Sequence, residues 1–308
     1  MNRIELSVII PTHKRKDYLF FELDHIYNQK DVCFEIIVVN DVDTPDETDE
    51  ITKQYPDVIY IKDSSIQGPS NKHKAGYKIS KGNYLYMPDD DDYLTDDLFF
   101  RKAIDLMNDN IKLAFVSGQC LISYEFDDKE KNYFEDDVMN ARGYIRNVDY
   151  LQEFQHKLDK ATSTVSTIFR RKAFDETDAV NMIEMSDSSM YMQSLLWGDA
   201  LVLDDVVAVY RIKKNSLTTT LSFLFIMNVM RQKEQIYKRS RTLLNNPRDF
   251  WYNQFSLTYN FYTAKKRIEK IRLLLWGWLH MHFSIKMLYF CFLQSLREIK
   301  SFLLGRKK

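Results

Sequence analysis

The sequence predicts an α/β fold in which a mostly parallel, Rossmann-like sheet carries helices on both faces and is followed by an all-helical region. Three observations support this fold class. In the first half, short apolar runs rich in β-branched residues alternate with amphipathic segments, the order that builds parallel sheets. Polar residues or Pro follow these runs, as they follow buried strands. Beyond residue 221 the apolar spacing is helical, with a break at 245–247.

The expected elements follow one another in strand–helix order. Strands are expected at 6–10, 35–39, 58–61 and 84–87, and later at 113–124, 165–170 and 201–211. Helices are expected at 17–29, 45–55, 70–81 (ended by Gly82) and about 186–197, with an acidic surface loop at 125–137. Ligands of such sheets bind at the carboxyl ends of strands. Thr12, Asp41 and Asp89 each lie just past a strand, so they should line one crevice.

Composition excludes several classes of protein. An apolar content of 45% with 8 Gly and 6 Pro excludes a disordered or fibrous chain. Three widely spaced cysteines form neither a disulfide framework nor a zinc-ligand pattern, and they suit a reducing compartment. The residues before Pro11 hold too short an apolar run for a signal peptide. We therefore expect a cytoplasmic protein.

Charge is distributed unevenly along the chain, although the formal net charge is only −1. Residues 221–308 hold 17 Lys and Arg against 4 Asp and Glu, whereas residues 1–220 hold 26 against 40. An acidic body joined to a basic tail implies that the two parts have different partners.

The run of four aspartates at 89–92 follows a buried strand and precedes Tyr93 and Leu94. Carboxylates gathered in a cleft repel one another unless a cation offsets their charge. Mg²⁺ and similar hard cations prefer oxygen ligands and commonly keep substrate phosphates in their shell. The run therefore predicts a site for a metal-bridged diphosphate, and the alternative is a solvated acidic turn.

Three segments together carry a family resemblance: Ser-Val-Ile-Ile-Pro-Thr at 7–12, Glu-Ile-Ile-Val-Val-Asn-Asp at 35–41 and Gly-Asn-Tyr-Leu-Tyr-Met-Pro-Asp-Asp-Asp-Asp at 82–92. In order and spacing they resemble the family 2 inverting glycosyltransferases, which have a GT-A fold. The resemblance covers about residues 4–125 and continues more weakly to about 220. It implies a GT-A catalytic domain at 1–220, with nucleotide-sugar binding at 1–125 and the acceptor and base part at 126–220. Residues 221–308 would form a basic helical region.

The resemblance assigns the nucleotide to Pro11, Thr12 and Asp41, because in the family the segment after the first strand and the acid after the second hold the base and ribose. A carboxylate facing the imide N–H of uracil is chemically suitable, since that group is a donor. The alternative role for Asp41 is to stabilise an Asx-turn.

Within the tetrad, Asp89 and Asp91 match the two acids of the family's D-x-D motif. The resemblance implies that Asp89 faces the ribose or the metal shell and that Asp91 ligates Mn²⁺ or Mg²⁺. Asp90, which we group with the residues that bind the nucleotide sugar, and Asp92 could share these roles, because one sequence does not define the register inside the run.

Basic residues are expected near the diphosphate. Lys72, His73 and Lys74 lie near a predicted helix start, a place where anions bind; the alternative is a solvated basic helix face. Arg211 and Lys213 resemble part of the family's Tyr-Arg-x-His-x-x-Ser ending, with Lys in place of the usual His, and are further candidates for the diphosphate. Arg211 could equally form a structural ion pair.

An inverting transfer needs a base that takes the proton from the acceptor hydroxyl. By resemblance Asp187, at the start of a predicted helix, occupies the position of that base. Ser186 replaces the family's usual preceding Glu, and Glu184 is the alternative base. The structural alternative for Asp187 is to cap the helix.

The basic region is rich in aromatic residues between 271 and 296. Its longest charge-free stretch, 273–285, is shorter than the ~20 residues that span a bilayer, and Lys286 follows it. Two readings remain open: helices that lie on an anionic membrane surface, or an appendage that packs on the catalytic domain or on another subunit in a homo-oligomer. An anionic polymer acceptor would also explain the charge.

The resemblance thus implies a metal-dependent inverting hexosyltransferase that uses a UDP-sugar donor and a lipid-linked glycan acceptor destined for the cell surface. We expect it at the inner face of the cell membrane, with no nucleic-acid partner. A sugar nucleotidyltransferase is disfavoured because residues 11–15 contain no Gly for a phosphate loop, and a dinucleotide-binding oxidoreductase is disfavoured because G-x-G-x-x-G is absent. The remaining alternative is a non-catalytic glycan-binding or membrane-surface protein on the same fold.

Overall fold

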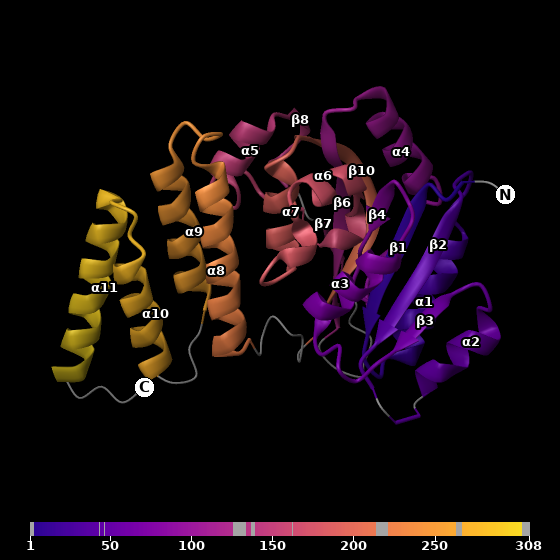
Figure 1. Cartoon of the computed structure of the whole chain (residues 1–308), viewed down its shortest axis with the longest axis horizontal. Coiled ribbons are helices and arrows are strands. Elements are labelled where there is room, and N and C mark those ends of the chain that lie inside the picture. Colours follow the sequence, from indigo (N-terminus) through magenta and orange to yellow (C-terminus); the bar gives the residue numbers. More distant parts are fainter. Residues whose placement is uncertain are drawn as a thin grey trace.

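The computed structural model describes residues 3–42, 44–45, 47–125, 134–136, 139–161, 163–213, 221–262 and 267–303 (Figure 1). Within them the strands form one mixed sheet with the order β3-β2-β1-β4-β9-β6-β10-β5, while β7 pairs with β6 and β8 with β10. The strands are β1 (Leu6–Thr12), β2 (Phe34–Asn40), β3 (Ile59–Lys62), β4 (Tyr84–Tyr86), β5 (Tyr93–Leu94), β6 (Leu113–Glu125), β7 (Phe134–Asp136), β8 (Gly143–Ile145), β9 (Thr167–Arg170) and β10 (Asp199–Lys213).

Within the described residues, the sheet has a continuous parallel block of four strands and a second parallel pair. Strands β3, β2, β1 and β4 run parallel, and so do β6 and β10, but β9 lies antiparallel between β4 and β6. The carboxyl ends of β1, β2 and β4 therefore meet at one edge, as the sequence predicted for Thr12, Asp41 and Asp89.

Helices cover both faces because neighbouring strand residues point to opposite sides. Val8 and Ile10 join a core under α1 (Lys16–Tyr27), α2 (Ile51–Gln54) and α4 (Phe99–Asp109). Ile9 joins the core on the other face. The helices of that face are α3 (Pro69–Ile79), α5 (Asn147–Glu153), α6 (Arg171–Glu176) and α7 (Asp187–Leu195).

The C-terminal helices extend the second core. They are α8 (Phe223–Ser240), α9 (Pro247–Phe261), α10 (Arg267–Leu279) and α11 (Ile285–Leu303). Buried residues from all four, among them Ile226, Trp251, Leu273 and Cys291, belong to the same apolar cluster as Ile9. Figure 1 shows α8 and α9 beside the sheet-containing part and α10 and α11 outermost. Among the described residues, no helix is both long and apolar enough to cross a membrane.

Several sequence predictions need correction. Gly82 does not end the third helix, which stops at Ser80 with extended backbone. A Cβ on Gly82 would lie 2.5 Å from the backbone nitrogen of Ser7, so glycine is needed there for close packing against β1. The helix at 45–55 is a 3₁₀ turn, Glu47–Glu50, followed by the short α2. Most of the predicted loop at 125–137 lies outside the described residues, but 134–136 form β7.

Helix α4 lies in a stretch where we predicted no element. Its buried residues, Phe99, Phe100, Ala103, Ile104 and Met107, have helical spacing, so the pattern was readable from the sequence.

Candidate active site

A cleft of about 380 Å³ opens at the carboxyl ends of the strands. Every residue predicted to bind the nucleotide sugar lines it: Pro11, Thr12, Asp41, Lys72, Asp89 and Asp90. Asp91 and Arg211 line it as well. Residues up to 200 positions apart therefore meet in one place, and the topology of the sheet brings them there.

Asp41 is held by three groups at one end of the cleft. Its Oδ1 lies 2.6 Å from Nδ1 of His13 and 3.3 Å from Nζ of Lys72, and its Oδ2 accepts the N–H of Gly68 at 3.2 Å. Burial opposes ionisation, but these contacts outweigh it and lower the pKa of Asp41. The side chain is therefore a carboxylate at neutral pH.

Lys72 is buried, so the alternative of a solvated basic helix face does not describe it. Its Nζ donates to the carbonyl oxygen of Thr12 at 2.8 Å. Burial lowers the pKa of Lys72, although Asp41 and Asp90 oppose that shift. His73, the next residue, is also buried, and burial lowers its pKa to about 4, so its imidazole is neutral at physiological pH.

Two members of the aspartate run hold the loop in place. Asp90 accepts hydrogen bonds from Thr12 Oγ1 at 2.8 Å and from Arg15 Nη1 at 2.9 Å. Asp92 is fully buried and accepts from Ser163 Oγ at 2.8 Å and from the backbone N–H of Arg211 at 2.9 Å. The run is therefore packed into the protein and is not a solvated turn.

The other two members, Asp89 and Asp91, differ from each other. Asp91 Oδ2 lies 3.0 Å from Arg15 Nη1 and 3.0 Å from Lys213 Nζ. Asp89 has no hydrogen-bond or ion-pair partner among the described residues. Burial, and then the carboxylate of Asp187 and the rest of the run, raise the pKa of Asp89 well above its usual value. Arg15 attracts Asp89 electrostatically without pairing with it, so an ionised Asp89 is a negative charge that a proton or an added cation would offset.

Arg211 lies among aromatic rings at the edge of the cleft. Its guanidinium is 4.5 Å from the ring centre of Tyr93 and 4.8 Å from that of Phe21, and its Nη1 donates to the carbonyl oxygen of Asp91 at 2.8 Å. These contacts fix its orientation. Contact between Arg211 and a diphosphate stays a prediction.

A second cavity, of about 510 Å³, shares the wall formed by Asp89. Asp187 and Glu184 line it. Asp187 is the first residue of α7 and Ser186 is its N-cap residue, so the carboxylate of Asp187 is not the helix cap. Its side chain is 36% exposed, and the nearest cation is Lys160 Nζ at 4.0 Å.

Glu184, the alternative base, interacts with more neighbouring groups. Burial raises its pKa, and Ser70, Lys74 and Asn228 oppose that shift. The far wall of this second cavity consists of residues from the start of α8, including Leu224, Phe225 and Asn228.

Sequence reasoning missed three contributors. His13 and Arg15 lie in the loop directly after β1 and make ion pairs with Asp41, Asp90 and Asp91. Their position in the sequence could have indicated this role, because the loop after β1 lies at the same edge of the sheet as the predicted site. The α8 wall had no local signal, because its approach to α7 depends on tertiary packing.

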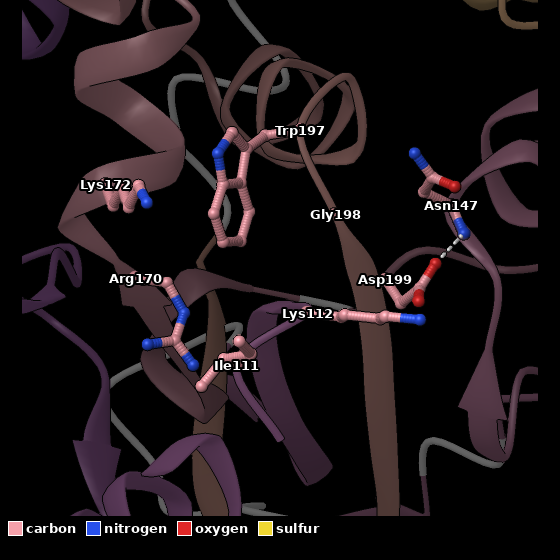
Figure 2. Close-up of a pocket in the computed structure, with 8 residues that line it drawn as sticks. All are labelled: Ile111, Lys112, Asn147, Arg170, Lys172, Trp197, Gly198 and Asp199. Carbon is pink, nitrogen blue, oxygen red and sulfur yellow. Dashed lines mark hydrogen bonds between the residues drawn. The ribbon is translucent and has the colours of Figure 1, made fainter.

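A larger hollow, of about 670 Å³, lies at the other end of the sheet, where β6 and β10 begin (Figure 2). Its polar groups are already satisfied. Arg170 donates to the carbonyl oxygens of Leu113, Met107 and Asn110, and Asp199 accepts the backbone N–H of Asn147 at 2.7 Å. None of the predicted site residues lines it, so we place the chemistry in the acidic cleft.

No three His, Cys, Asp or Glu side chains of the described residues form a ready-made group of metal ligands. That does not argue against Mg²⁺ or Mn²⁺ chemistry, because Mg²⁺ is usually held by one or two carboxylates together with substrate phosphates and water. Asp89 and Asp91 meet that requirement, and the uncompensated carboxylate of Asp89 fits a cation.

Comparison with known proteins decides the family. Residues 7–196 match the model of glycosyl transferase family 2. The chain belongs to this family. The predicted family and enzyme class are therefore confirmed.

Two curated relatives illustrate the extent of the similarity. The chain is 30% identical over 150 residues to an uncharacterized glycosyltransferase of Rickettsia bellii. The aligned region covers 47% of the chain and 20% of that protein. It is 32% identical over 89 residues to the UDP-Glc:α-D-GlcNAc-diphosphoundecaprenol β-1,3-glucosyltransferase WfaP of Escherichia coli. Here the aligned region covers 29% of the chain and 36% of that protein. The chain thus matches about a fifth to a third of these relatives' length.

Solved structures share the fold at low sequence identity. Residues 1–349 of Staphylococcus aureus TarS with UDP-GlcNAc superpose with a TM-score of 0.56 at 13% identity, covering 98% of this chain and 93% of that one. The mannosyltransferase PcManGT of Pyrobaculum calidifontis, solved with GDP-Man and Mn²⁺, has a TM-score of 0.52 at 14% identity, covering 100% and 89%. The predicted GT-A fold class is confirmed.

Proposed function

We propose that this protein is a metal-dependent inverting glycosyltransferase that moves a hexose from a UDP-sugar to a hydroxyl of a growing, lipid-linked cell-surface glycan. One observation carries the proposal. Asp89 and the segment 67–69 line both of two adjoining cavities, one rich in paired charges around Asp41 and Lys72 and the other lined by Asp187. A transferase needs two such adjoining sites, one for the donor and one for the acceptor.

The donor side suits a uridine diphosphate. Asp41 is ionised and can accept the imide N–H of uracil, and Lys72 and Arg15 bring positive charge to the cleft. TarS was solved with UDP-GlcNAc, which supports this choice of donor. Asp89 and Asp91 would hold Mn²⁺ or Mg²⁺, and such a cation supplies positive charge to a leaving diphosphate.

The acceptor side supplies the base. The acceptor oxygen attacks the anomeric carbon, the bond from that carbon to the diphosphate oxygen breaks, and the hydroxyl proton passes to Asp187. Asp187 suits this role because its side chain is 36% exposed and its one ion pair among the described residues, with Lys160 at 4.0 Å, is long, so a substrate hydroxyl can reach the carboxylate. Attack from the side opposite the leaving group inverts the configuration.

The proposed domain roles follow the same division. Residues 1–125 would bind the donor, residues 126–220 would provide the base, and residues 221–308 would serve the acceptor and the membrane. The basic region shares a core with the catalytic part and its first helix lines the acceptor cavity. A lipid-linked acceptor, as the name of WfaP states for that enzyme, would place the protein at the inner face of the cell membrane.

The test is a donor screen. Purified protein is incubated with UDP-, GDP- and dTDP-sugars, with and without Mn²⁺, and nucleotide release is measured. We expect slow release of UDP from one UDP-hexose, dependent on the metal. Neither release nor binding with any nucleotide sugar would instead favour a non-catalytic glycan- or membrane-surface protein. Release of pyrophosphate from a nucleoside triphosphate and a sugar phosphate would favour a nucleotidyltransferase.

A further inference from the structure

The outer face of helix α11 carries an apolar stripe that nothing in the described chain covers. Six of its large side chains are at least 45% exposed: Ile285, Leu288, Tyr289, Phe292, Leu296 and Ile299. At about 100° per residue they all fall within roughly 100° of the helix circumference. Consecutive exposed apolar residues on one face form a surface, whereas isolated ones are common on any protein.

Helix α11 also has a separate apolar face that is already used. Met287 and Cys291 are fully buried in the core shared with α9 and α10. Because this inner face already anchors the helix, the outer stripe is not needed to hold the fold together. An exposed apolar stripe that the fold does not need indicates an interaction surface.

The neighbouring helix α10 and the turn between the two helices also carry exposed apolar side chains. Ile268, Leu275 and Leu279 of α10 are 55%, 57% and 83% exposed. Phe283 in the turn is 90% exposed, and both His282 and Phe283 have positive φ angles. Bulky residues rarely adopt that conformation, which costs energy. The turn thus holds an aromatic ring out in solvent at a conformational cost.

Exposed apolar side chains are concentrated in this hairpin. Of the 20 large apolar side chains that are exposed among the described residues, ten belong to residues 268–299. The remaining ten are scattered over the rest of the described chain. The α10–α11 hairpin is therefore the main apolar surface of the described part of the molecule.

Positive charge flanks the stripe. Lys286, Arg297 and Lys300 of α11 are exposed and lie on one side of it, within roughly a third of a turn. Residues 267–303 contain six Lys and Arg against two Asp and Glu. Of the two acids, Glu298 pairs with Arg267 and Glu269 accepts the hydroxyl of Tyr262. Lys286 pairs with Asp249 of α9 at 2.5 Å, so Arg297 and Lys300 carry the positive charge of the flank.

We propose that the α10–α11 hairpin docks on the surface of an anionic lipid bilayer, with the stripe and Phe283 in the headgroup region and the basic flank against lipid phosphates. Apolar and aromatic residues beside Lys and Arg are the composition of helices that lie in this interface. A second copy of the chain fits less well, because two identical surfaces carry the same positive charge, whereas anionic lipid phosphates complement it. The inference does not depend on the sugar-transfer reaction.

The experiment is co-sedimentation of the full chain with vesicles of phosphatidylcholine alone or with phosphatidylglycerol, at low and high salt. The wild type is expected to bind the anionic vesicles and to bind them less at high salt. The triple variant Leu288→Gln, Phe292→Gln and Leu296→Gln should weaken the partition at least about tenfold, because it removes apolar insertion. Arg297→Gln with Lys300→Gln should weaken it roughly fivefold per charge.

The matched control is Leu98→Gln with Ile111→Gln, which replaces two exposed apolar residues of the catalytic part, 50% and 75% exposed. This variant should bind vesicles like the wild type. Circular dichroism and thermal melting of each variant establish that it is folded. UDP release from a soluble donor is measured in parallel, so failure of the enzyme proposal and failure of membrane docking are seen separately.

Three outcomes would overturn the proposal. The stripe variant could bind vesicles as well as the wild type. The wild type could bind neutral and anionic vesicles equally at all salt concentrations. It could also bind no vesicles and form a dimer that the stripe variant abolishes, which would assign the surface to self-association.

Discussion

The proposed donor cleft and the proposed acceptor cavity share Asp89, but the carboxylates that line them differ in how closely they are paired with cations. In the cleft, Asp41, Asp90 and Asp91 are each paired at 3.3 Å or less with His13, Lys72, Arg15 or Lys213. In the cavity, the nearest cation to Asp187 is 4.0 Å away. Paired charges are oriented in advance and hold a fixed ligand. A carboxylate with only this long ion pair is less constrained and is accessible to a substrate hydroxyl. The difference supports the proposed division, with donor binding on one side and proton transfer on the other.

The largest effect that could break this division is loss of the base. We expect Asp187→Asn to lower kcat by about 10²- to 10⁴-fold, the usual contribution of a positioned base, while UDP-sugar affinity is retained. Steady-state kinetics and calorimetric titration of the donor measure the two quantities. Glu184→Gln is the matched control and should lower kcat much less. Full transfer by Asp187→Asn would remove it as the base.

A second prediction concerns pH and His73, which is buried and lines the second cavity. Burial lowers its pKa to about 4, so the unfolded chain takes up a proton near pH 6.5 while the folded protein does not. His73 therefore costs stability progressively as pH falls from about 6.5 to 4, by up to about 3 kcal/mol. Denaturant unfolding of the wild type and of His73→Leu across this range measures the difference. Parallel pH curves for the two proteins would contradict it.

A third prediction concerns Asp89, which lines both cavities. We expect Asp89→Asn to weaken Mn²⁺-dependent binding of UDP at least about tenfold, since even removal of a group behind a metal ligand commonly has that effect. Binding of UDP without metal should change little. Titration of UDP with and without Mn²⁺ separates the two. Asp92→Asn is not a suitable control, because Asp92 holds Ser163 and the backbone of Arg211.

The smallest expected effect concerns the α8 wall of the acceptor cavity. Leu224 is 67% exposed and lines this cavity, so Leu224→Ala should leave the fold intact. If an acceptor packs on it, the KM for acceptor should rise about fivefold, which corresponds to about 1 kcal/mol of apolar contact. Donor KM and UDP release without acceptor should not change. An unchanged acceptor KM would show that α8 does not contact the acceptor.

Local patterns predicted most of the first half of the fold. The runs at 6–10, 35–39 and 58–61 became β1, β2 and β3 with ends shifted by a few residues, because β-branched apolar runs encode buried strands directly. The helix at 45–55 was overestimated, and α4 was missed although its apolar spacing is regular. In the site, placement of Thr12, Asp41 and Asp89 followed from strand ends alone.

By itself, the sequence determined the strand order along the chain, the acidic run after a buried strand and the contrast between an acidic body and a basic tail. These are local properties that residue type and spacing encode. Only the tertiary structure decided which acids face the cleft, that Arg15 and Lys213 meet at Asp91, and that α8 closes the acceptor cavity. Those contacts join residues far apart in the chain, and they depend on how sheet and helices pack, which no local pattern specifies.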